Sequence, residues 1–275
     1  MDAKTHTLDQ FIEGRFKEKI PEEFERMGRR ARALYHYTSI DVFEKMLHGD
    51  ADFYLSESSL LNDSKEFKTG LDYLFEYAKG HRLDLCGITK MKVESWSSNP
   101  ADEPWVMCFT TEHDSLGQWM AYTDRHNGGV AVGFDFDKLS ALTREAYRKW
   151  RTGEDGFGSL IFLVPCFYVP LESEKVNQLI QFMFGPYRDR QIALNSIDDD
   201  SFRPSLTMEL ILILSSMIKH DSFRAEKEWR IVALPHSEEK VAKYEFLGGK
   251  PRLKSRIFGE REKLRDAIVE VFRSP

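Results

Sequence analysis

The clearest alternation of polar and apolar side chains lies near the C-terminal end, over residues 223–232. Successive side chains of a β-strand point to opposite faces, so an extended segment here places Glu226, Glu228 and Arg230 on one face. At a rise of about 3.3 Å per residue, the two carboxylates of such a strand lie about 7 Å apart. The apolar residues 231–234 follow directly. The pattern therefore predicts a strand that carries a carboxylate pair at its entrance and then runs into the core.

Other segments follow the period of a helix or that of a strand. Helices are predicted over residues 7–32 (with a break at Pro21), 40–48, 64–79, a short stretch after Asp114, 137–150, 206–218 and 261–272. Strands are predicted over residues 33–38, 52–56, 105–110, 130–136 and within 160–169. No internal repeat or clear linker separates them. This mixture favours one α+β domain, residues 33–275, that follows a helical N-terminal arm, residues 1–32.

Composition and charge narrow the class of protein. The chain has 275 residues, of which 41% are hydrophobic, enough to bury a core. Its net charge of −6 argues against binding to nucleic acid that is mainly electrostatic. Its three cysteines lack the spacing of a zinc cluster or a disulfide framework. The N-terminus lacks the character of a signal peptide, and the most apolar run, residues 206–218, is too short to cross a bilayer. We therefore expect a soluble, cytoplasmic protein without membrane contact.

The carboxylate pair and a histidine are the first candidates for chemistry. Glu226 and Glu228 at the start of a buried strand suit the stabilisation of a cation; the alternative is a salt-bridged strand face. His36 and Thr38 share one face of the predicted strand 33–38. A neutral imidazole there can orient a sugar hydroxyl, or it can serve as a structural residue.

Aromatic and polar side chains supply further candidates for ligand binding. Tyr54 offers a ring for a planar heterocycle, with the Ser56 hydroxyl beside it, although Tyr54 suits core packing equally well. Asn62 belongs either to a loop over a ligand or to the start of the next helix. Trp119 and Tyr122 lie three residues apart on one helical face, which indicates either core packing or an aromatic wall.

Five segments occur in an order that resembles a known family. They are residues 34–39 (LYHYTS), 61–66 (LNDSKE), 107–110 (MCFT), 119–122 (WMAY) and 219–230, which begins with Lys-His and ends with Glu-x-Glu-x-Arg. Together they resemble domain-of-unknown-function family 2971, a prokaryotic family, over roughly residues 33–234. That pattern is in turn similar to the ADP-ribosyltransferase superfamily, whose members split NAD between nicotinamide and ribose.

The resemblance implies a fold, a substrate and residue roles. The implied fold is a single α+β domain with a central mixed or antiparallel split sheet flanked by helices. His36 matches the first-strand histidine that binds the ribose of NAD, and Tyr54 or Ser56 matches the second-strand position. Glu228 matches the catalytic glutamate. The chemistry of the residues themselves suggests that Glu226 activates the acceptor as general base or positions it. NAD is then the substrate, and Thr38, Asn62, Trp119, Tyr122 and Arg230 complete the expected binding site.

The resemblance also implies partners. Small prokaryotic transferases of this superfamily often act as toxins or phage-defence effectors that modify a protein or a nucleic acid. A macromolecular acceptor is therefore expected, together with an antitoxin or regulatory partner.

Two other functions compete with the transferase. Asp135, Asp137 and Lys138 follow a predicted strand and resemble the acidic cluster of some metal-dependent nucleases, although Asp137 is also a good helix cap. Alternatively, the glutamates form a structural network, and the domain binds a nucleotide or a protein without catalysis.

Overall fold

The computed structural model describes most of the chain outside its N-terminal segment. The described residues are 20–48, 54–58, 66–83, 85–96, 104–123, 128–152, 159–184, 202–235, 244–247, 250–254 and 261–274. Of the predicted site residues, Asn62 lies outside these ranges, as does the first part of the predicted N-terminal arm.

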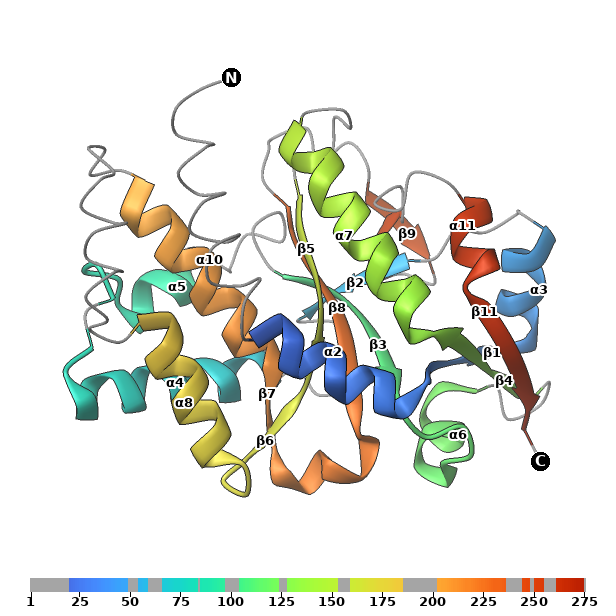
Figure 1. Ribbon diagram of the computed structural model, residues 1–275, viewed down its shortest axis with the longest axis horizontal. Coiled ribbons are helices and arrows are strands. Elements are labelled where there is room, and N and C mark those ends of the chain that lie inside the picture. The colour runs from blue at the N-terminus through green and yellow to red at the C-terminus, as the bar shows by residue number, and fades with distance from the viewer. Residues whose placement is uncertain are drawn as a thin grey trace.

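A large antiparallel sheet forms the centre of the described part (Figure 1). Its nine strands are β1 (Ala33–Ser39), β2 (Tyr54–Glu57), β3 (Trp105–Thr110), β4 (Gly129–Asp135), β5 (Ser159–Pro165), β8 (Glu228–Pro235), β9 (Tyr244–Leu247), β10 (Lys250–Lys254) and β11 (Ile268–Arg273). Every pairing within this sheet is antiparallel. A separate pair, β6 (Phe167–Val169) and β7 (Ile218–His220), is parallel.

The sheet divides at β3. On one side, β3 pairs with β8 along its whole length, from Trp105 opposite Ala233 to Thr110 opposite Glu228. On its other side, it pairs with β1 at one end, through Thr110 alone, and with β2 at the other end. Two separate groups of strands, or arms, thus extend from this side of β3: one is β1-β4-β11 and the other is β2-β10-β9. The predicted α+β class with a split antiparallel sheet is confirmed.

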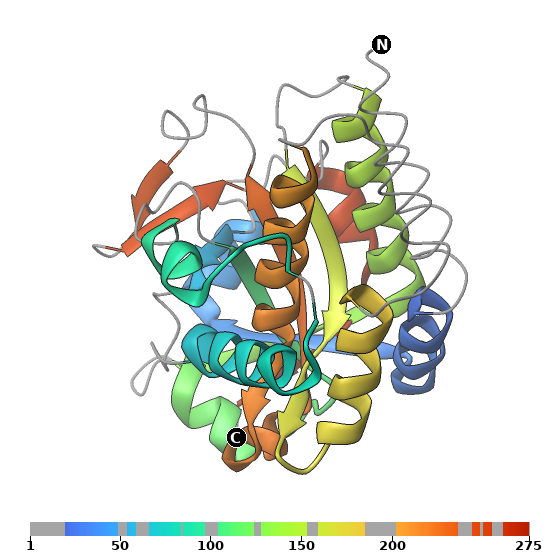
Figure 2. The ribbon, with the colours of Figure 1, turned by 90° about the vertical axis from the view of Figure 1, so that its left-hand side faces the viewer.

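Helices cover both faces of the sheet. One hydrophobic cluster lies under α4 (Glu66–His81), α8 (Ser173–Phe184) and α10 (Phe202–Met217), which stand in front of the sheet in Figure 2. The other lies under α3 (Ile40–His48), α7 (Phe136–Thr152) and α11 (Arg261–Asp266). Strand β8 serves both clusters, because Val232 belongs to the first and Ile231 and Ala233 to the second. Burial on both faces explains why this part of the sequence is continuously apolar.

Three further α-helices lie in the described ranges, besides the 3₁₀ helix η3 (Asp221–Glu226). They are α2 (Ile20–Ala31), α5 (Lys90–Trp96) and α6 (Leu116–Tyr122). In α2, Phe24 packs against both hydrophobic clusters, with its ring 6.0 Å from that of Phe167. The predicted boundary at residue 32, between arm and domain, stays a prediction.

Several predicted elements were wrong in detail. Residues 268–273 form the edge strand β11 rather than the end of a helix, since β-branched and aromatic side chains there suit pairing with β4. The buried helix α10 ends at Met217, and residues 218–220 continue as β7. Helix α7 is capped by Asp135, whose side chain accepts from the Lys138 N–H at 2.9 Å, rather than by Asp137. The hairpin of β9 and β10 was not predicted.

Among the helices of the described ranges, none combines the length and the apolar character that a bilayer crossing requires.

The contact between α4 and α10 predicts a stability difference between two glycines of one helix. A Cβ atom added to Gly70 would lie 2.1 Å from the backbone oxygen of Ser215, whereas one added to Gly80 would meet nothing within 4 Å. We expect Gly70→Ala to lower the free energy of unfolding by about 1–3 kcal/mol, because the two helix backbones must separate. Gly80→Ala is the matched control and should raise it by about 0.4–1 kcal/mol. Urea denaturation followed by circular dichroism measures both; equal effects would contradict the close helix contact.

Candidate functional site

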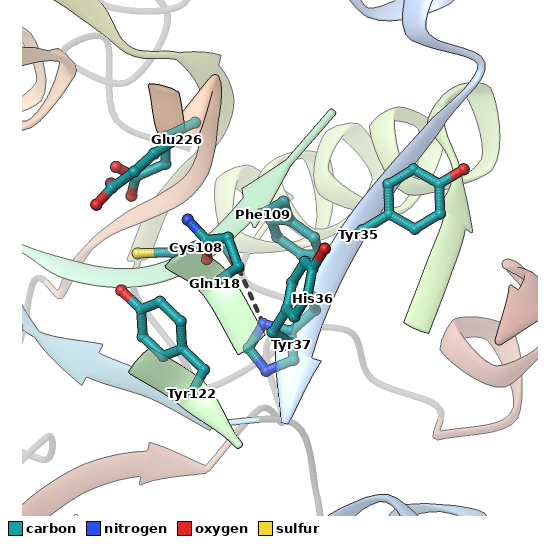
Figure 3. A pocket seen from close by; sticks show the side chains of 9 residues that line it. Tyr35, His36, Tyr37, Cys108, Phe109, Gln118, Tyr122 and Glu226 are labelled. Carbon is teal, nitrogen blue, oxygen red and sulfur yellow. Dashed lines mark hydrogen bonds between the residues drawn. The ribbon is translucent and has the colours of Figure 1, made fainter. Parts of the chain in front are cut away.

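A small pocket opens where β1 and β3 separate (Figure 3). Its volume is about 30 Å³. The side chains that matter for its chemistry are His36, Cys108, Gln118, Tyr122, Glu226 and Glu228. They come from β1, β3, α6 and the segment that leads into β8. The pocket is therefore a product of the sheet division.

His36 bridges the gap between the diverging strands. Its Nδ1 lies 2.9 Å from the backbone oxygen of Cys108. Because a carbonyl oxygen only accepts hydrogen bonds, Nδ1 carries the proton in this contact. The imidazole also packs near Phe109, which belongs to the hydrophobic cluster on the sheet face opposite to Glu228. His36 thus supports the split and reaches the pocket from the other side of the sheet.

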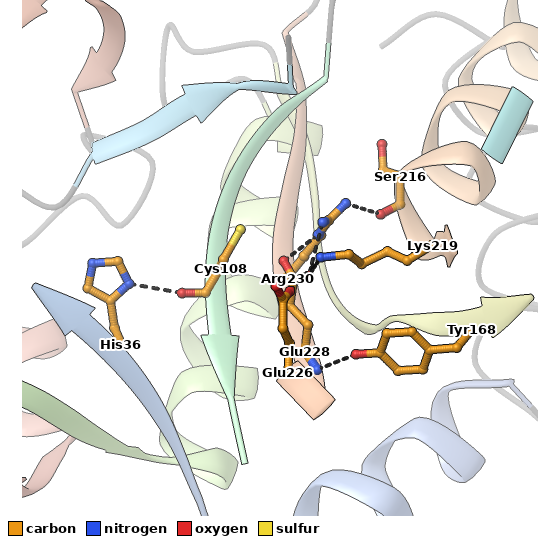
Figure 4. A network of polar contacts seen from close by, with 8 residues as sticks. All are labelled: His36, Cys108, Tyr168, Ser216, Lys219, Glu226, Glu228 and Arg230. Atoms are coloured by element: carbon orange, nitrogen blue, oxygen red, sulfur yellow. Dashed lines mark hydrogen bonds and ion pairs between the residues drawn. The ribbon is translucent and has the colours of Figure 1, made fainter. Parts of the chain in front are cut away.

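Glu228 is held in a buried network of charges (Figure 4). Its Oε2 lies 2.5 Å from Lys219 Nζ and 3.1 Å from Arg230 Nη2, and its Oε1 lies 2.7 Å from Arg230 Nε. The side chains of Glu228 and Lys219 are only 5% and 2% exposed. Lys219 Nζ also lies 2.6 Å from Glu226 Oε2. One ammonium group therefore contacts both carboxylates.

The small parallel sheet fixes this network in place. Tyr168 of β6 and Lys219 of β7 are directly opposite each other. The Tyr168 hydroxyl accepts a hydrogen bond from the Glu228 backbone N–H at 2.7 Å. Arg230 Nη1 donates to the backbone oxygen of Ser216, near the end of α10, at 2.8 Å. The start of β8 is therefore hydrogen-bonded to Tyr168 of β6, to Lys219 of β7 and to the Ser216 backbone oxygen of α10.

The electrostatics of the site follow from burial and from these charges. Burial alone would raise the pKa of Glu228, but the charges of Arg230 and Lys219 lower it to about 2. The pKa of the Cys108 thiol is raised well above its usual value by burial and by the charge of the Glu228 carboxylate. Loss of hydration raises the pKa of the Tyr122 hydroxyl, and Glu228 and Glu226 add to that effect. Glu228 is therefore ionised at neutral pH, while Cys108 and Tyr122 keep their protons.

Glu226 does not belong to the strand as predicted. It ends the 3₁₀ helix η3 (Asp221–Glu226), and β8 begins only at Glu228. Lys227 between them adopts the left-handed conformation, with φ of 43°. Because both Oε2 atoms lie within 2.6 Å of Lys219 Nζ, these two carboxylate oxygens are at most about 5 Å apart. The turn at Lys227 thus brings the acids closer than the roughly 7 Å expected of a regular strand.

The structure brings together some of the predicted site residues. His36, Tyr122, Glu226 and Glu228 line the pocket, and Arg230 lies in the network behind it. Trp119 and Tyr122 do not form one ligand-facing wall. Trp119 is buried, and its ring packs edge-to-face against that of Tyr37, with the ring centroids 4.6 Å apart. Its indole N–H donates a hydrogen bond to the Asp114 carboxylate.

Of the remaining predicted residues, Asn62 lies outside the described ranges, and the others belong to β1 and β2. Thr38 is buried on β1, opposite Val130 of β4. Ser56 and Tyr54 belong to β2, in the other arm of the divided sheet, and the Tyr54 backbone pairs with Lys254 of β10. Their assignment to a ligand stays a prediction.

Sequence reasoning missed four contributors to the site: Lys219, Tyr168, Cys108 and Gln118. Burial of Lys219 could have been predicted from the sequence, because this lysine directly follows the apolar run 206–218. A lysine at the end of a buried segment requires a counter-charge, and Asp221, Glu226 and Glu228 all follow it within nine residues along the chain.

The acidic cluster proposed for a nuclease is engaged in local structure. Asp135 caps α7, Asp137 pairs with Arg29 at 2.9 Å, and Lys138 Nζ donates to the Asp266 backbone oxygen at 2.7 Å. Over the described ranges, no group of three or more His, Cys, Asp or Glu side chains is arranged to hold a metal ion. The nuclease hypothesis stays a prediction.

The chain is thus an α+β protein with a split antiparallel sheet and a carboxylate-lined pocket at the split. Residues 118–231 match the model of a family described as "Protein of unknown function (DUF2971)". The match runs from α6 to the middle of β8, so it contains Lys219 and both glutamates. No curated protein and no solved structure matches the chain.

The buried network predicts a large loss of stability when its ammonium group is removed. Lys219→Met leaves the buried Glu228 with one cation fewer, so we expect the free energy of unfolding to fall by about 3–5 kcal/mol. The control is Lys175→Met, which breaks an ion pair with Glu172 whose lysine is 57% exposed. That change should cost no more than about 1 kcal/mol. Guanidinium denaturation of both variants tests this, and equal losses would show that the network adds no stability.

The lowered pKa of Glu228 predicts how stability depends on pH. A carboxyl group whose pKa is about 2 when folded and 4.5 in its reference state stabilises the fold above pH 4.5 and loses this contribution between pH 4.5 and 2. Glu228→Gln removes that contribution. The difference in free energy of unfolding between wild type and variant should therefore be largest near neutral pH and shrink as the pH falls through this window. Urea titrations at a series of pH values measure it; a constant difference would contradict an ionised Glu228.

Proposed function

We propose that the protein is an ADP-ribosyltransferase-like enzyme that cleaves the bond between nicotinamide and ribose in NAD. The observation that carries the proposal is the pair Glu226 and Glu228 at the inner wall of a pocket formed by the split of an antiparallel sheet. The ordered resemblance of the sequence segments to the superfamily supports it as well.

The chemistry of the reaction suits a carboxylate at that wall. When the bond between ribose C1′ and the nicotinamide nitrogen breaks, its electron pair moves to the pyridinium ring, and positive charge develops on the ribose. A fixed carboxylate in a site with little water stabilises that charge. An oxygen or nitrogen of the acceptor then bonds to C1′ and releases its proton to solvent. The products are nicotinamide and an ADP-ribosylated acceptor.

The pocket is too small to hold NAD unless it enlarges. A volume of about 30 Å³ is well below the roughly 300–1,000 Å³ of a typical ligand site. Gln118 and Tyr122 form the wall that α6 contributes, and α6 is a helix of seven residues. Under this proposal, NAD binding displaces α6 outward.

The same observations favour a second candidate function, a non-catalytic binding module. Glu228 is almost fully buried and paired with two cations, as a structural residue would be. In this case the pocket recognises part of a nucleotide or protein without turnover. Ligand binding without nicotinamide release distinguishes this function from the transferase.

The acceptor of the transferase remains to be identified and is proposed to be a protein or a nucleic acid. By resemblance, the enzyme would act as a toxin or phage-defence effector, with an antitoxin or regulatory partner in its host.

Labelled NAD tests the proposal directly. Purified protein is incubated with NAD labelled on nicotinamide or on adenylate, with and without cell lysate. We expect nicotinamide release, and a loss of about 10²–10³-fold in the double variant Glu226→Gln, Glu228→Gln, on the scale of a lost transition-state contact. Adenylate label on protein or nucleic acid identifies the acceptor class.

The control is Glu174→Gln, an exposed residue of α8 outside the pocket. It should leave the rate unchanged. The transferase would be refuted by folded wild-type protein that releases no nicotinamide with any lysate fraction, and the binding module would then be the better description.

A further inference from the structure

We infer that Gln118 and Tyr122 of α6 form a recognition site for a primary carboxamide, and that the group it binds is the carboxamide of nicotinamide. This inference rests on the proposed function, because it takes nicotinamide as the group that leaves. It adds a ligand contact from α6, an element separate from the segment that carries the two glutamates.

The position of α6 is set by its contacts with β1. The ring of Trp119 packs on that of Tyr37, and the Tyr37 hydroxyl accepts a hydrogen bond from the Ser115 backbone N–H at 3.0 Å. These contacts decide which side of the helix faces the pocket. Gln118 and Tyr122 are four residues apart, so they are neighbours on the helix surface, and both line the pocket.

The polarity of α6 is the reverse of what a purely structural cover would show on its pocket side. Its apolar residues Leu116 and Met120 are 74% and 68% exposed. The two residues that line the pocket, Gln118 and Tyr122, carry polar groups instead. A helix that only closed the split in the sheet would be more stable with apolar side chains at these two positions. The inward polar groups therefore favour a role in ligand binding.

These polar groups are directed to where a ligand would lie. The Gln118 amide and the Tyr122 hydroxyl point into the pocket (Figure 3). Within the described ranges, no hydrogen bond joins either group to another part of the protein. The glutamine amide offers an oxygen acceptor and two N–H donors, and the protonated tyrosine hydroxyl adds a further donor.

A primary carboxamide matches the size of the pocket and the groups that line it. The volume of about 30 Å³ holds about two water-sized groups, since one water molecule needs roughly 10–15 Å³. The nitrogen and the oxygen of one carboxamide are two such groups. The ligand N–H can donate to the Gln118 oxygen, while the ligand oxygen accepts from the Gln118 N–H or the Tyr122 hydroxyl. A carboxylate has no N–H and would leave the Gln118 oxygen without a donor.

This contact orients the substrate for the proposed reaction. The carboxamide fits the pocket as it stands, whereas the pyridinium ring requires the outward movement of α6. Gln118 and Tyr122 move with the helix, so the space between them and the glutamates widens. With its carboxamide held on α6, the ring directs its bond to ribose C1′ toward Glu226 and Glu228. Gln118 and Tyr122 thus bind and position the group that leaves.

An analogue of NAD tests the site through substrate preference. In acetylpyridine adenine dinucleotide, a methyl group replaces the amide nitrogen of nicotinamide. We expect kcat/KM of the wild type to be about 10-fold or more higher for NAD, because the analogue leaves the Gln118 oxygen without a donor. Gln118→Leu should reduce this preference to within about 2-fold, since neither substrate then has a partner there.

Tyr122→Phe gives a different expected result. Its hydroxyl donates to the carbonyl oxygen, which both substrates carry, so kcat/KM should fall by a similar factor for both and the preference for NAD should remain. The matched control is Met120→Leu, a leucine substitution on the outer side of the same helix, which should change neither value. Circular dichroism verifies that each variant is folded.

Binding of nicotinamide alone provides a readout that needs no turnover. Labelled nicotinamide is measured by equilibrium dialysis against the folded wild type and the same variants. We expect the Kd to rise by about 10-fold in Gln118→Leu, and to stay unchanged in Met120→Leu. Nicotinate, which carries a carboxylate in place of the carboxamide, should compete poorly with nicotinamide in the wild type.

The possible results separate this inference from the function on which it rests. An active wild type whose preference for NAD persists in Gln118→Leu would overturn the inference and leave the transferase intact. An equal loss in Met120→Leu would also overturn it, because the effect would then come from the helix rather than from the amide. An inactive wild type that binds nicotinamide through Gln118 would refute the transferase and support the carboxamide site. A folded wild type with neither activity nor nicotinamide binding would overturn both.

Discussion

The buried ammonium group of Lys219 is the contact on which the surrounding structure depends. Charges are expensive to bury, and this one is stabilised by two carboxylates that lie within 2.6 Å of it. Glu228 in turn requires Arg230, whose guanidinium group reaches the end of α10 at the Ser216 oxygen. Because each charge is balanced by the next, the end of α10, the β6–β7 pair and the start of β8 must form together. The site and this part of the fold are therefore parts of one interaction network.

The division of the sheet explains why a pocket exists beside that network. Continuous pairing of β1 with β3 would leave no room between them, but the two strands share only the Tyr35–Thr110 pair. The oxygen of Cys108, near this point, is satisfied by the imidazole of His36 instead of by a strand neighbour. Helix α6 is placed over the gap by the packing of Trp119 on Tyr37. His36 thus has a structural reason to be at this position, whether or not it also touches a ligand.

The fold class was predictable, and the geometry of the site was only partly so. Alternation and helical spacing are local signals, and they identified the central strands and the helix that precedes β8. The split required knowledge of which strands pair, which no local pattern carries. Glu226 was misplaced because the alternation of residues 223–232 also fits a 3₁₀ turn followed by a strand that starts at Glu228. The pairing of Lys219 with both acids depends on the parallel register of β7 with β6, a contact between segments about 50 residues apart.

The energetics of the network favour a functional reason for its charges. A buried ion pair can often be replaced by apolar side chains with no loss of stability, so structure alone does not require Lys219 and Glu228. The left-handed backbone at Lys227 adds strain, and the close approach of two carboxylates adds repulsion that the shared ammonium and Arg230 offset. Departures of this kind concentrate at sites where geometry serves binding or catalysis. A binding module would need only the partly exposed Glu226, because one accessible carboxylate suffices to recognise a cation. Under the transferase proposal, the buried Lys219 orients the carboxylates towards a positive charge that develops on the ribose.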